Sequence, residues 1–580
     1  MGYSDPTYGS YWLSATAVLV FSSWILKSYW DARKLPPGPR GLPILGNMFQ
    51  VPAQMPWFKF TEWSQQYGPV FSFNVAGQVY IVLNTFKAAA DLLEAAERRS
   101  NIYSDRPRMI VANEILGGGL ALPFARYDNR FRKMRRAAHE GLSARAVQKY
   151  EHVEAREAAA TVVQILEAPE RWYDHIKRTS ASTILAVLYG WPSVKTEDEN
   201  LIHRIASVVI RMVKSVVPGT YLVNVFPFLN HLPRWMASWK RDGLEWHRRD
   251  TEMFMKFNKE VQEKTYPETS ASCFVSDLLE NTDANELSEE EAAWLPGTML
   301  SAAAESTSAT LNSFILAMVL YPTALRKAQA ELDAVVGRER APTFSDQKNL
   351  PYIDALIKEI LRWRPPGPMG WYLDCPTLSF VDESFRPIHL ALPRSVMEDD
   401  WYDGFYIPKG ATIFPNIWAM HRDPPIFSDP EDFMPERFFG EIPEDTHSTG
   451  HTSFGFGRRC VSMFILQSKD PNELSPASYA TSSRICVGIS LANQMLFINV
   501  AVMLWALNIK KATDSEGNFI VPSPADFVDT GIVVFVFPLT SKVCSLIRLC
   551  LESSPAPFKC KFSPRFPNAL SILQRDLEET

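Results

Sequence analysis

Two short segments near the C-terminal end carry the strongest chemical signal in the chain. They are Phe454–Arg459 and a run that contains Cys486 and Gly488. Placed side by side they read F-G-F-G-R-R-I-C-V-G, although the 25 residues of Cys460–Arg484 separate them. Glycines let such a loop bend tightly, so that backbone N–H groups approach the sulfur atom. A thiolate held in this way is a ligand suited to a transition metal.

A second cysteine competes for this role. Cys460 follows Arg459 directly and has no glycine two residues after it, whereas Gly488 stands two residues after Cys486. The pattern therefore favours Cys486 as the reactive thiolate. For Cys273 and Cys560 we expect the behaviour of buried, inert thiols.

A segment of a long predicted helix could handle protons. Ala302-Ala303-Ala304 precede Glu305, Ser306 and Thr307. Small residues let a helix pass close to a bound group, and an acid next to an alcohol can move protons. The spacing leaves open whether Ser306 or Thr307 is the alcohol, and a solvated glutamate on a small-residue packing face is the alternative.

Charged residues at helical spacing supply a third signal. Glu359 and Arg362 form an E-x-x-R pattern, which places both side chains on one helix face. Arg437 lies in a P-E-R-F element downstream, Arg135 follows Phe131 by four residues, and Arg394 stands in a Leu-Pro-Arg-Ser run. For Arg135 an ordinary basic helix face is the alternative interpretation.

Together these segments resemble cytochrome P-450 monooxygenases, whose haem-binding loop reads F-x-x-G-x-R-x-C-x-G. The oxygen-activation motif A-G-x-[DE]-T, the E-x-x-R pair, the P-E-R-F element and W-x-x-x-R also have counterparts here. Three positions depart from the family: Ala303 replaces a common glycine, Ser306 replaces threonine, and Phe131 replaces tryptophan.

The resemblance implies haem b (iron protoporphyrin IX) as the cofactor, with Cys486 as the axial ligand of its iron. The other residues that it assigns to the cofactor are Arg135, Arg394 and Arg459 at the propionates, Phe454 beside the sulfur, and Gly457 and Gly488 in the loop. It further implies that Glu305 with Ser306 or Thr307 relays protons to dioxygen. Glu359, Arg362 and Arg437 would form a buried structural charge network.

The implied reaction inserts one atom of dioxygen into a lipophilic small molecule. No flavin or nicotinamide motif is present, so the resemblance implies electrons from NADPH through a separate NADPH-cytochrome reductase. The run Met397–Gly410 is similar to microsomal fungal members near O-methylsterigmatocystin oxidoreductase. Two alternatives remain: an inactive membrane-anchored product with a disrupted haem loop, or a haem-thiolate isomerase or dehydratase.

The rest of the chain must position these residues, and its periodicity predicts mostly helices. With 580 residues, 59 Lys+Arg against 65 Asp+Glu and a net charge of −6, the composition is globular and shows no nucleic-acid footprint. Seven cysteines indicate a reducing compartment. The predicted helices are Phe58–Tyr67, Thr85–Ala96, Phe131–Leu142, Ala144–Glu167, Arg248–Tyr266, Glu289–Leu320 (regular from about Met299, because Pro296-Gly297 interrupts it), Leu325–Val336 and Tyr352–Trp363. The predicted strands are Val70–Val75, Val79–Leu83 and Trp401–Ile407. The fold class is therefore mainly α with small β-sheets (α+β), the P-450 fold by resemblance.

The N-terminal region predicts a membrane anchor. Residues 11–26 carry no charge, and extended to Trp30 the segment is long enough to cross a bilayer. Lys27, Arg33 and Lys34 follow the uncharged part. We expect a lumenal tail (1–10), a transmembrane helix (11–30), a proline-rich hinge (31–46) and a cytoplasmic haem-thiolate domain (47–580). We therefore expect a single-pass protein of the endoplasmic reticulum membrane; a cleaved signal peptide is the alternative.

Three segments interrupt the family pattern: 371–391, 460–484 and about 535–554. The second separates Arg459 from the cysteine that it should accompany. We interpret all three as retained introns that keep the reading frame, with surface insertions as the alternative.

Overall fold

The computed structural model describes residues 33–52, 56–94, 101–194, 204, 207–208, 211–212, 214–216, 220–264, 272–368, 393–439, 451–456, 485–524, 527–530, 533–534, 547–548, 552–555 and 557–579. The predicted anchor at 11–30 and the proposed insertions at 371–391 and 460–484 lie outside these residues.

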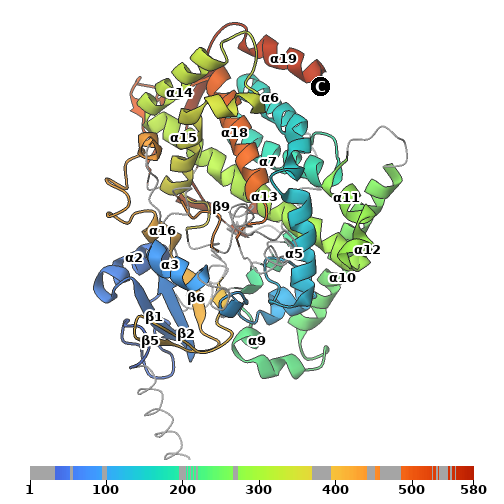
Figure 1. The fold of residues 1–580 in the computed structure, drawn as a ribbon, viewed down its shortest axis with the longest axis vertical. Coiled ribbons are helices and arrows are strands. Elements are labelled where there is room, and N and C mark those ends of the chain that lie inside the picture. Colours follow the sequence, from blue (N-terminus) through green and yellow to red (C-terminus); the bar gives the residue numbers. More distant parts are fainter. Residues whose placement is uncertain are drawn as a thin grey trace, which may run out of the picture.

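Helices dominate the described chain, as the periodicity predicts. They are α2 (Pro56–Tyr67), α3 (Phe86–Leu93), α5 (Asn129–Leu142), α6 (Glu151–Glu167), α7 (Trp172–Tyr189), α9 (Leu222–Val225), α10 (Ser238–Lys264), α11 (Phe274–Glu280), α12 (Thr282–Asn285), α13 (Glu289–Leu320), α14 (Pro322–Val335), α15 (Pro351–Trp363), α16 (Ile417–Met420), α18 (Ile489–Ala506) and α19 (Ala569–Glu579). Figure 1 shows α13 and α18 in the middle of the helical part, with α6, α7, α14 and α15 around them.

The largest sheet lies beside the helical part, at the lower left of Figure 1. Its strand order is β1 (Val70–Val75), β2 (Gln78–Leu83), β6 (Thr412–Pro415) and β3 (Arg394–Ser395). The turn between β1 and β2 consists of Ala76 and Gly77, both at positive φ, which matches the twist of a two-residue hairpin. The short strand β3 pairs antiparallel with β6, and its first residue is Arg394.

Smaller sheets complete the β structure. The pairs are β4 (Asp400–Tyr402) with β5 (Phe405–Ile407), β9 (Phe527–Thr530) with β12 (Glu552–Pro555), and β10 (Val533–Val534) with β11 (Ile547–Arg548); β7 (Leu507–Thr513) lies between β13 (Cys560–Pro564) and β8 (Phe519–Ile520). Residues 547–548 and 552–554, inside the third proposed insertion, thus pair with strands that precede it.

Helix α13 is continuous over Glu289–Leu320, so the expectation that its regular part begins near Met299 is wrong. Ser288 caps its N-terminus in a capping box with Glu291. Pro296 cannot donate a hydrogen bond to the carbonyl of Ala292, but the buried Asn258 side chain on α10 donates to that oxygen at 3.1 Å. A partner from a neighbouring helix therefore satisfies the carbonyl that proline leaves unpaired.

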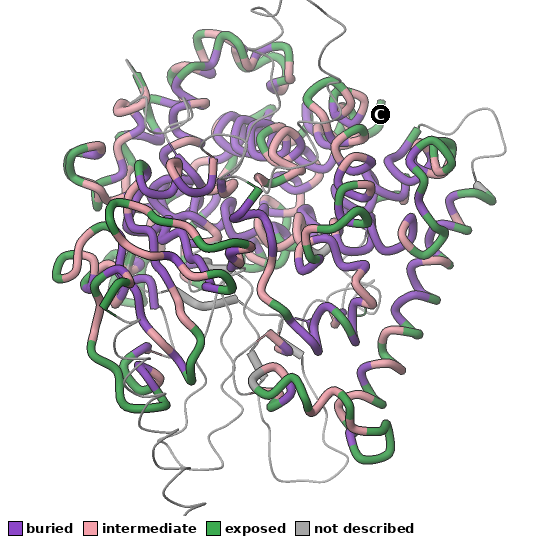
Figure 2. The backbone as a smooth tube through the Cα atoms, turned by 60° about the horizontal axis from the view of Figure 1, so that its bottom comes forward, coloured by how far each residue is buried: buried purple, intermediate pink, exposed green. Residues whose placement is uncertain are grey.

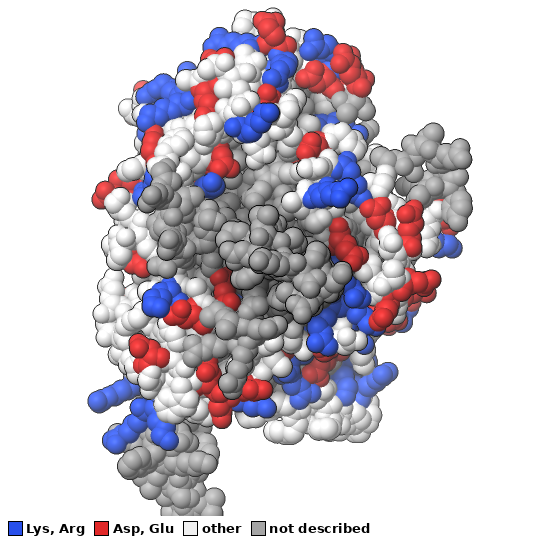
Figure 3. Space-filling view, viewed as in Figure 1, with Lys and Arg blue, Asp and Glu red and all other residues white. Residues whose placement is uncertain are grey.

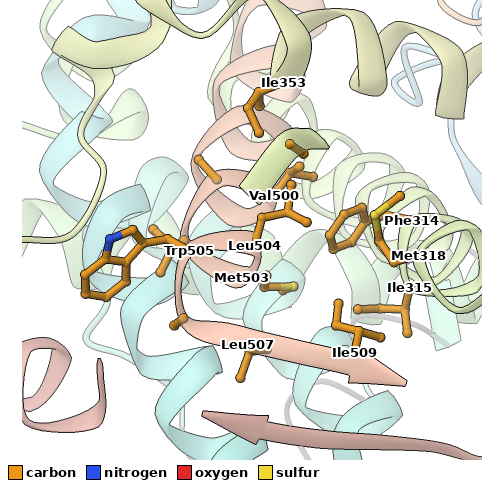
Figure 4. Close-up of a cluster of buried hydrophobic side chains, with 14 of the residues drawn as sticks. Phe314, Ile315, Met318, Ile353, Val500, Met503, Leu504, Trp505, Leu507 and Ile509 are labelled. Carbon is orange, nitrogen blue, oxygen red and sulfur yellow. The ribbon is translucent and has the colours of Figure 1, made fainter. Parts of the chain in front are cut away.

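The core surrounds α13 and α18, and the buried segments run through the interior of the trace in Figure 2. Figure 4 shows one part of it, where α13, α15, α18 and β7 meet; its labelled side chains are Phe314, Ile315, Met318, Ile353, Val500, Met503, Leu504, Trp505, Leu507 and Ile509. The sequence did not predict α7 or the full extent of α18. Both are buried on most sides, so they carry little of the amphipathic periodicity that marks a surface helix.

One helix in the described part of the chain, α18, is long and apolar enough to cross a membrane, and the bent pair α13–α14 would be a second candidate. Most of α18 (72%) is buried inside the protein, as expected for a core helix.

Candidate active site

The structure brings the two halves of the split glycine loop together. The backbone N–H of Cys486 donates a hydrogen bond to the carbonyl oxygen of Phe454 at 3.0 Å. Gly455 between them adopts a φ of +79°, a left-handed conformation that favours glycine. Phe454, Cys486 and Gly488 all line one cavity, which has a volume of about 290 Å³.

Cys486 lies at the beginning of α18. Gly488 occupies the N-cap position of that helix, and a Cβ atom added to it would lie 3.9 Å from the Cys486 sulfur. The positive end of the helix dipole therefore lies near the sulfur and favours the thiolate. Of the described cysteines, Cys273 is buried as expected, and burial raises the pKa of Cys560 to about 12, which keeps that thiol protonated.

Helix α13 forms another wall of the cavity with small and hydroxyl-bearing residues. Ala302 and Ala303 line it together with Ser306, Thr307 and Thr310. The Ser306 hydroxyl donates to the carbonyl of Ala302 at 3.0 Å, and the Thr310 hydroxyl donates to the carbonyl of Ser306 at 2.8 Å. Both candidate alcohols therefore face the cavity, so the structure leaves the choice between Ser306 and Thr307 open.

Glu305 does not line this cavity, unlike its neighbours on α13. Burial raises the pKa of its carboxyl group, and the charge of Lys177 on α7 lowers it in part. The geometry thus places two of the three predicted proton-handling residues at the cavity and the acid outside its lining.

Three arginines line the same cavity. Arg135 on α5 is buried, and its guanidinium group donates to the carbonyl of Ile485, next to Cys486. Arg394 on β3 is also buried and donates to the carbonyl of Phe456. The third is Arg106, which donates to the carbonyls of Pro123 at 3.0 Å and Pro393 at 2.9 Å. The sequence predicts no role for Arg106, because its positive charge is its only signal there and its place at the cavity is visible only in the structure.

Burial and neighbouring guanidinium groups destabilise the positive charge of two of these arginines, Arg106 and Arg394. Burial lowers the pKa of Arg106 to about 9, and repulsion by Arg394 and Arg135 contributes. Burial also lowers the pKa of Arg394 to about 10, with repulsion by Arg135. An anionic ligand in the cavity would relieve this strain, because it supplies the opposite charge in a site of low dielectric constant.

These features fit haem. A thiolate beside a helix N-terminus would ligate its iron, the small residues of α13 leave room on a cavity wall, and the three arginines would pair with its two propionate carboxylates. Two further predicted residues, Gly457 and Arg459, lie outside the described residues.

A buried charge network supports the loop from the side of α15. Arg362 donates to both carboxylate oxygens of Glu359, at 2.6 and 2.8 Å, and Arg437 donates to the same carboxylate at 3.1 Å. Glu359 and Arg362 are completely buried (0% exposed). The structure thus brings together all three residues of the predicted network.

Comparisons with known proteins identify the family of this chain. The family model described as Cytochrome P450 matches residues 36–375 and 377–461. Cytochrome P450 monooxygenase 58 of Postia placenta is 44% identical over 544 residues, covering 93% of this chain and 90% of its own. A cytochrome P450 monooxygenase of Armillaria gallica is 38% identical over 576 residues, covering 98% of this chain and 97% of its own.

A solved structure of a zebrafish cytochrome P450 with abiraterone has a TM-score of 0.61 and 20% sequence identity, and it covers 88% of this chain and 100% of its own. This likeness shows the fold. The chain therefore belongs to the cytochrome P450 family. The predictions of the P450 fold and of a haem-thiolate monooxygenase are confirmed.

Proposed function

We propose that this enzyme inserts one atom of dioxygen into a C–H or C=C bond of a lipophilic small molecule. The other oxygen atom leaves as water, which consumes two electrons and two protons. The observation that carries the proposal is the hydrogen bond from Cys486 to Phe454 at a cavity that three arginines line. Haem, when bound, supplies the oxidation chemistry that no amino-acid side chain provides.

The residues of this chain have distinct tasks in the proposal. Cys486 ligates the iron, and the N-terminus of α18 keeps its sulfur deprotonated. Arg135, Arg394 and Arg106 would hold the propionates, while the hydroxyl of Ser306 or Thr307 would hold a proton at the cavity wall. Glu305 exchanges protons with these alcohols from outside the cavity lining.

The substrate class follows from the remaining cavity wall. Leu122, Phe131, Ile184, Leu188 and Met299 line it with apolar side chains. An apolar lining favours a lipophilic substrate, because burial of apolar surface drives binding.

Electrons come, in this proposal, from NADPH through a separate reductase, since the sequence contains no flavin or nicotinamide motif. Residues 11–30 anchor the chain in the endoplasmic reticulum membrane. On the face shown in Figure 3, Lys and Arg side chains are interspersed with Asp and Glu, which supports a partner other than nucleic acid.

Removal of residues 1–30 should release much of the protein from membranes, and full retention would contradict the proposed membrane anchor.

The carbon monoxide difference spectrum of the reduced protein tests the proposal. We expect a Soret band at the thiolate position in the wild-type protein. Cys486→Ser should abolish that band, whereas the matched variant Cys460→Ser should keep it. A folded wild-type protein without the band would contradict the proposal, and loss of the band in Cys460→Ser would assign the ligand to the other cysteine.

NADPH dependence separates monooxygenation from the alternatives. Turnover with reductase should require NADPH and dioxygen in equal amounts. Turnover without NADPH would instead support an isomerase or dehydratase, and a chain that binds no haem would support the inactive product.

A further inference from the structure

A buried histidine lies between the charge network of α15 and the loop that carries Phe454. His421 follows α16 directly and is completely buried (0% exposed). Its backbone carbonyl accepts a hydrogen bond from Arg362 at 2.9 Å, so the arginine of the network contacts this residue. No motif in the sequence predicts a role for His421.

Both ring nitrogens of His421 have a partner. Nδ1 lies 3.0 Å from the carbonyl oxygen of Arg362, and Nε2 lies 2.9 Å from the backbone nitrogen of Thr452. A carbonyl can only accept and a backbone N–H can only donate. The ring must therefore be neutral, with its proton on Nδ1 and a lone pair on Nε2.

The ring thus connects two backbones that are 90 residues apart in sequence. From Thr452 the contacts continue toward the cavity. The carbonyl of Thr452 accepts from the N–H of Gly455 at 2.8 Å, which closes the turn around Phe454. The hydroxyl of Ser453 donates to the carbonyl of Leu361 at 2.7 Å, a second link to α15. The carbonyl of Phe454 then accepts the N–H of Cys486.

We propose that His421 is a positioning residue, which fixes the turn at Thr452–Gly455 and, through the Phe454 carbonyl, the backbone of Cys486 relative to α15. The inference rests on the proposed role of Cys486 as the haem ligand. The carbonyl of Phe454 orients the N–H of the cysteine, and backbone orientation determines where the sulfur points. A shift of about 1 Å in such a support is enough to spoil a metal site.

Surroundings of the ring agree with a fixed neutral tautomer. Burial lowers the pKa of His421 well below its usual value, and the neighbouring His451, Arg362 and Arg422 contribute by repulsion. The ring also stacks on Phe86, with centroids 6.1 Å apart. These contacts hold the plane of the imidazole in the orientation that both hydrogen bonds need.

Two amide variants separate the two hydrogen bonds. In His421→Gln, the longer side chain can place its carbonyl oxygen where Nε2 lies and accept from Thr452. In His421→Asn, the shorter side chain can place its NH₂ group where Nδ1 lies and donate to Arg362, but it cannot reach Thr452. The proposal therefore predicts that glutamine preserves the cysteine geometry and asparagine does not.

The experiment uses the full-length, haem-loaded protein and measures two quantities besides activity. The first is the fraction of haem with a thiolate-type Soret band in the reduced carbon monoxide complex. The second is the rate at which haem transfers to an excess of apomyoglobin. For His421→Asn we expect loss of most of the thiolate band and about tenfold faster haem loss, the scale typical of residues that orient a metal ligand. His421→Gln should stay within about threefold of wild type on the same scale.

Thr452→Val is the matched control. It removes the threonine hydroxyl, which lies 3.3 Å from Nε2, but keeps the backbone N–H that the proposal requires. We expect a wild-type spectrum and wild-type haem loss from this variant.

Three outcomes would overturn the inference. Equal thiolate fractions in the asparagine, glutamine and wild-type proteins would show that the link does not position Cys486. Equal losses in both amide variants, or failure of both to fold, would show that His421 only stabilises the fold. A wild-type protein without any thiolate band would instead overturn the proposed function, so the two failures are distinguishable.

Discussion

At the scale of single residues, three arginines around one cavity define its charge. Two of them, Arg135 and Arg394, belong to sequence patterns, whereas Arg106 was recognised only from its position. Each donates to backbone carbonyls that line or flank the site. Because their charges repel one another, each should contribute to the affinity for an anionic cofactor.

The substitution Arg106→Gln tests this contribution. It removes a positive charge but keeps a hydrogen-bond donor, so we expect about tenfold faster haem loss with little change in the fold. Arg108→Gln is the matched control, since Arg108 is exposed and pairs with Glu114 at 2.6 Å. Equal rates of haem loss in both variants would show that Arg106 does not contact the cofactor.

At the scale of elements, α15 carries two ion pairs with opposite surroundings. Glu359 is completely buried between Arg362 and Arg437, whereas Asp354 pairs with Lys358 at the surface at 2.7 Å. Removal of one partner from a buried pair leaves an uncompensated charge, but exposed pairs contribute little.

Glu359→Gln should therefore lower the free energy of unfolding by about 3–5 kcal/mol. Asp354→Asn on the same helix should change it by less than about 1 kcal/mol. Urea unfolding of the two variants measures the difference, and similar values would mean that the buried network adds no more than a surface pair.

The split haem loop is the second element on which function depends. Phe456 and Ile485, the described residues on either side of 457–484, line the same cavity. Deletion of Cys460–Arg484 joins Arg459 to Ile485 and restores the family spacing. Loop-closure entropy grows only logarithmically with length, so the deletion acts mainly through the position of Arg459.

We expect the shortened protein to bind more haem per chain and to give a cleaner thiolate spectrum than the full-length protein. The ratio of haem absorbance to protein concentration measures this. Equal or better loading of the full-length chain would identify the segment as a tolerated loop and contradict the retained-intron hypothesis.

At the scale of the whole molecule, stability should depend on pH through the buried histidine. His421 stays neutral in the folded protein because burial lowers its pKa well below 6.5, whereas in the unfolded chain it titrates near that value. Below pH 6.5 the unfolded state therefore binds more protons than the folded state. The free energy of unfolding therefore decreases as the pH is lowered below 6.5, by at most about 1.4 kcal/mol per pH unit for this one group.

Urea unfolding between about pH 7.5 and pH 5 checks this dependence. Wild-type stability should be fully present above pH 6.5 and decrease below it, and His421→Gln should show a smaller slope. An identical slope in the variant would assign the dependence to other groups, such as His175, whose pKa burial also lowers.

The sequence by itself determined the class of the protein and most of its helices. Amphipathic periodicity identified α5, α6, α14 and α15, because one face of each is buried and the other solvated. Short motifs with fixed chemistry identified Cys486, the glycine loop and the charged network on α15. These signals are local, so the order of residues along the chain is enough to read them.

Only the tertiary structure decided what depends on contacts between distant segments. Helix α13 stays regular through Pro296 because Asn258 on α10 satisfies the freed carbonyl of Ala292. Buried helices such as α7 and α18 lack a polar face to reveal their period. Arg106 is held by the carbonyl of Pro393, which lies hundreds of positions away in the sequence. His421 acquires its role from Arg362 and Thr452, which lie tens of positions before and after it. Their chemistry resides in the geometry of packing, which spacing along the sequence does not encode.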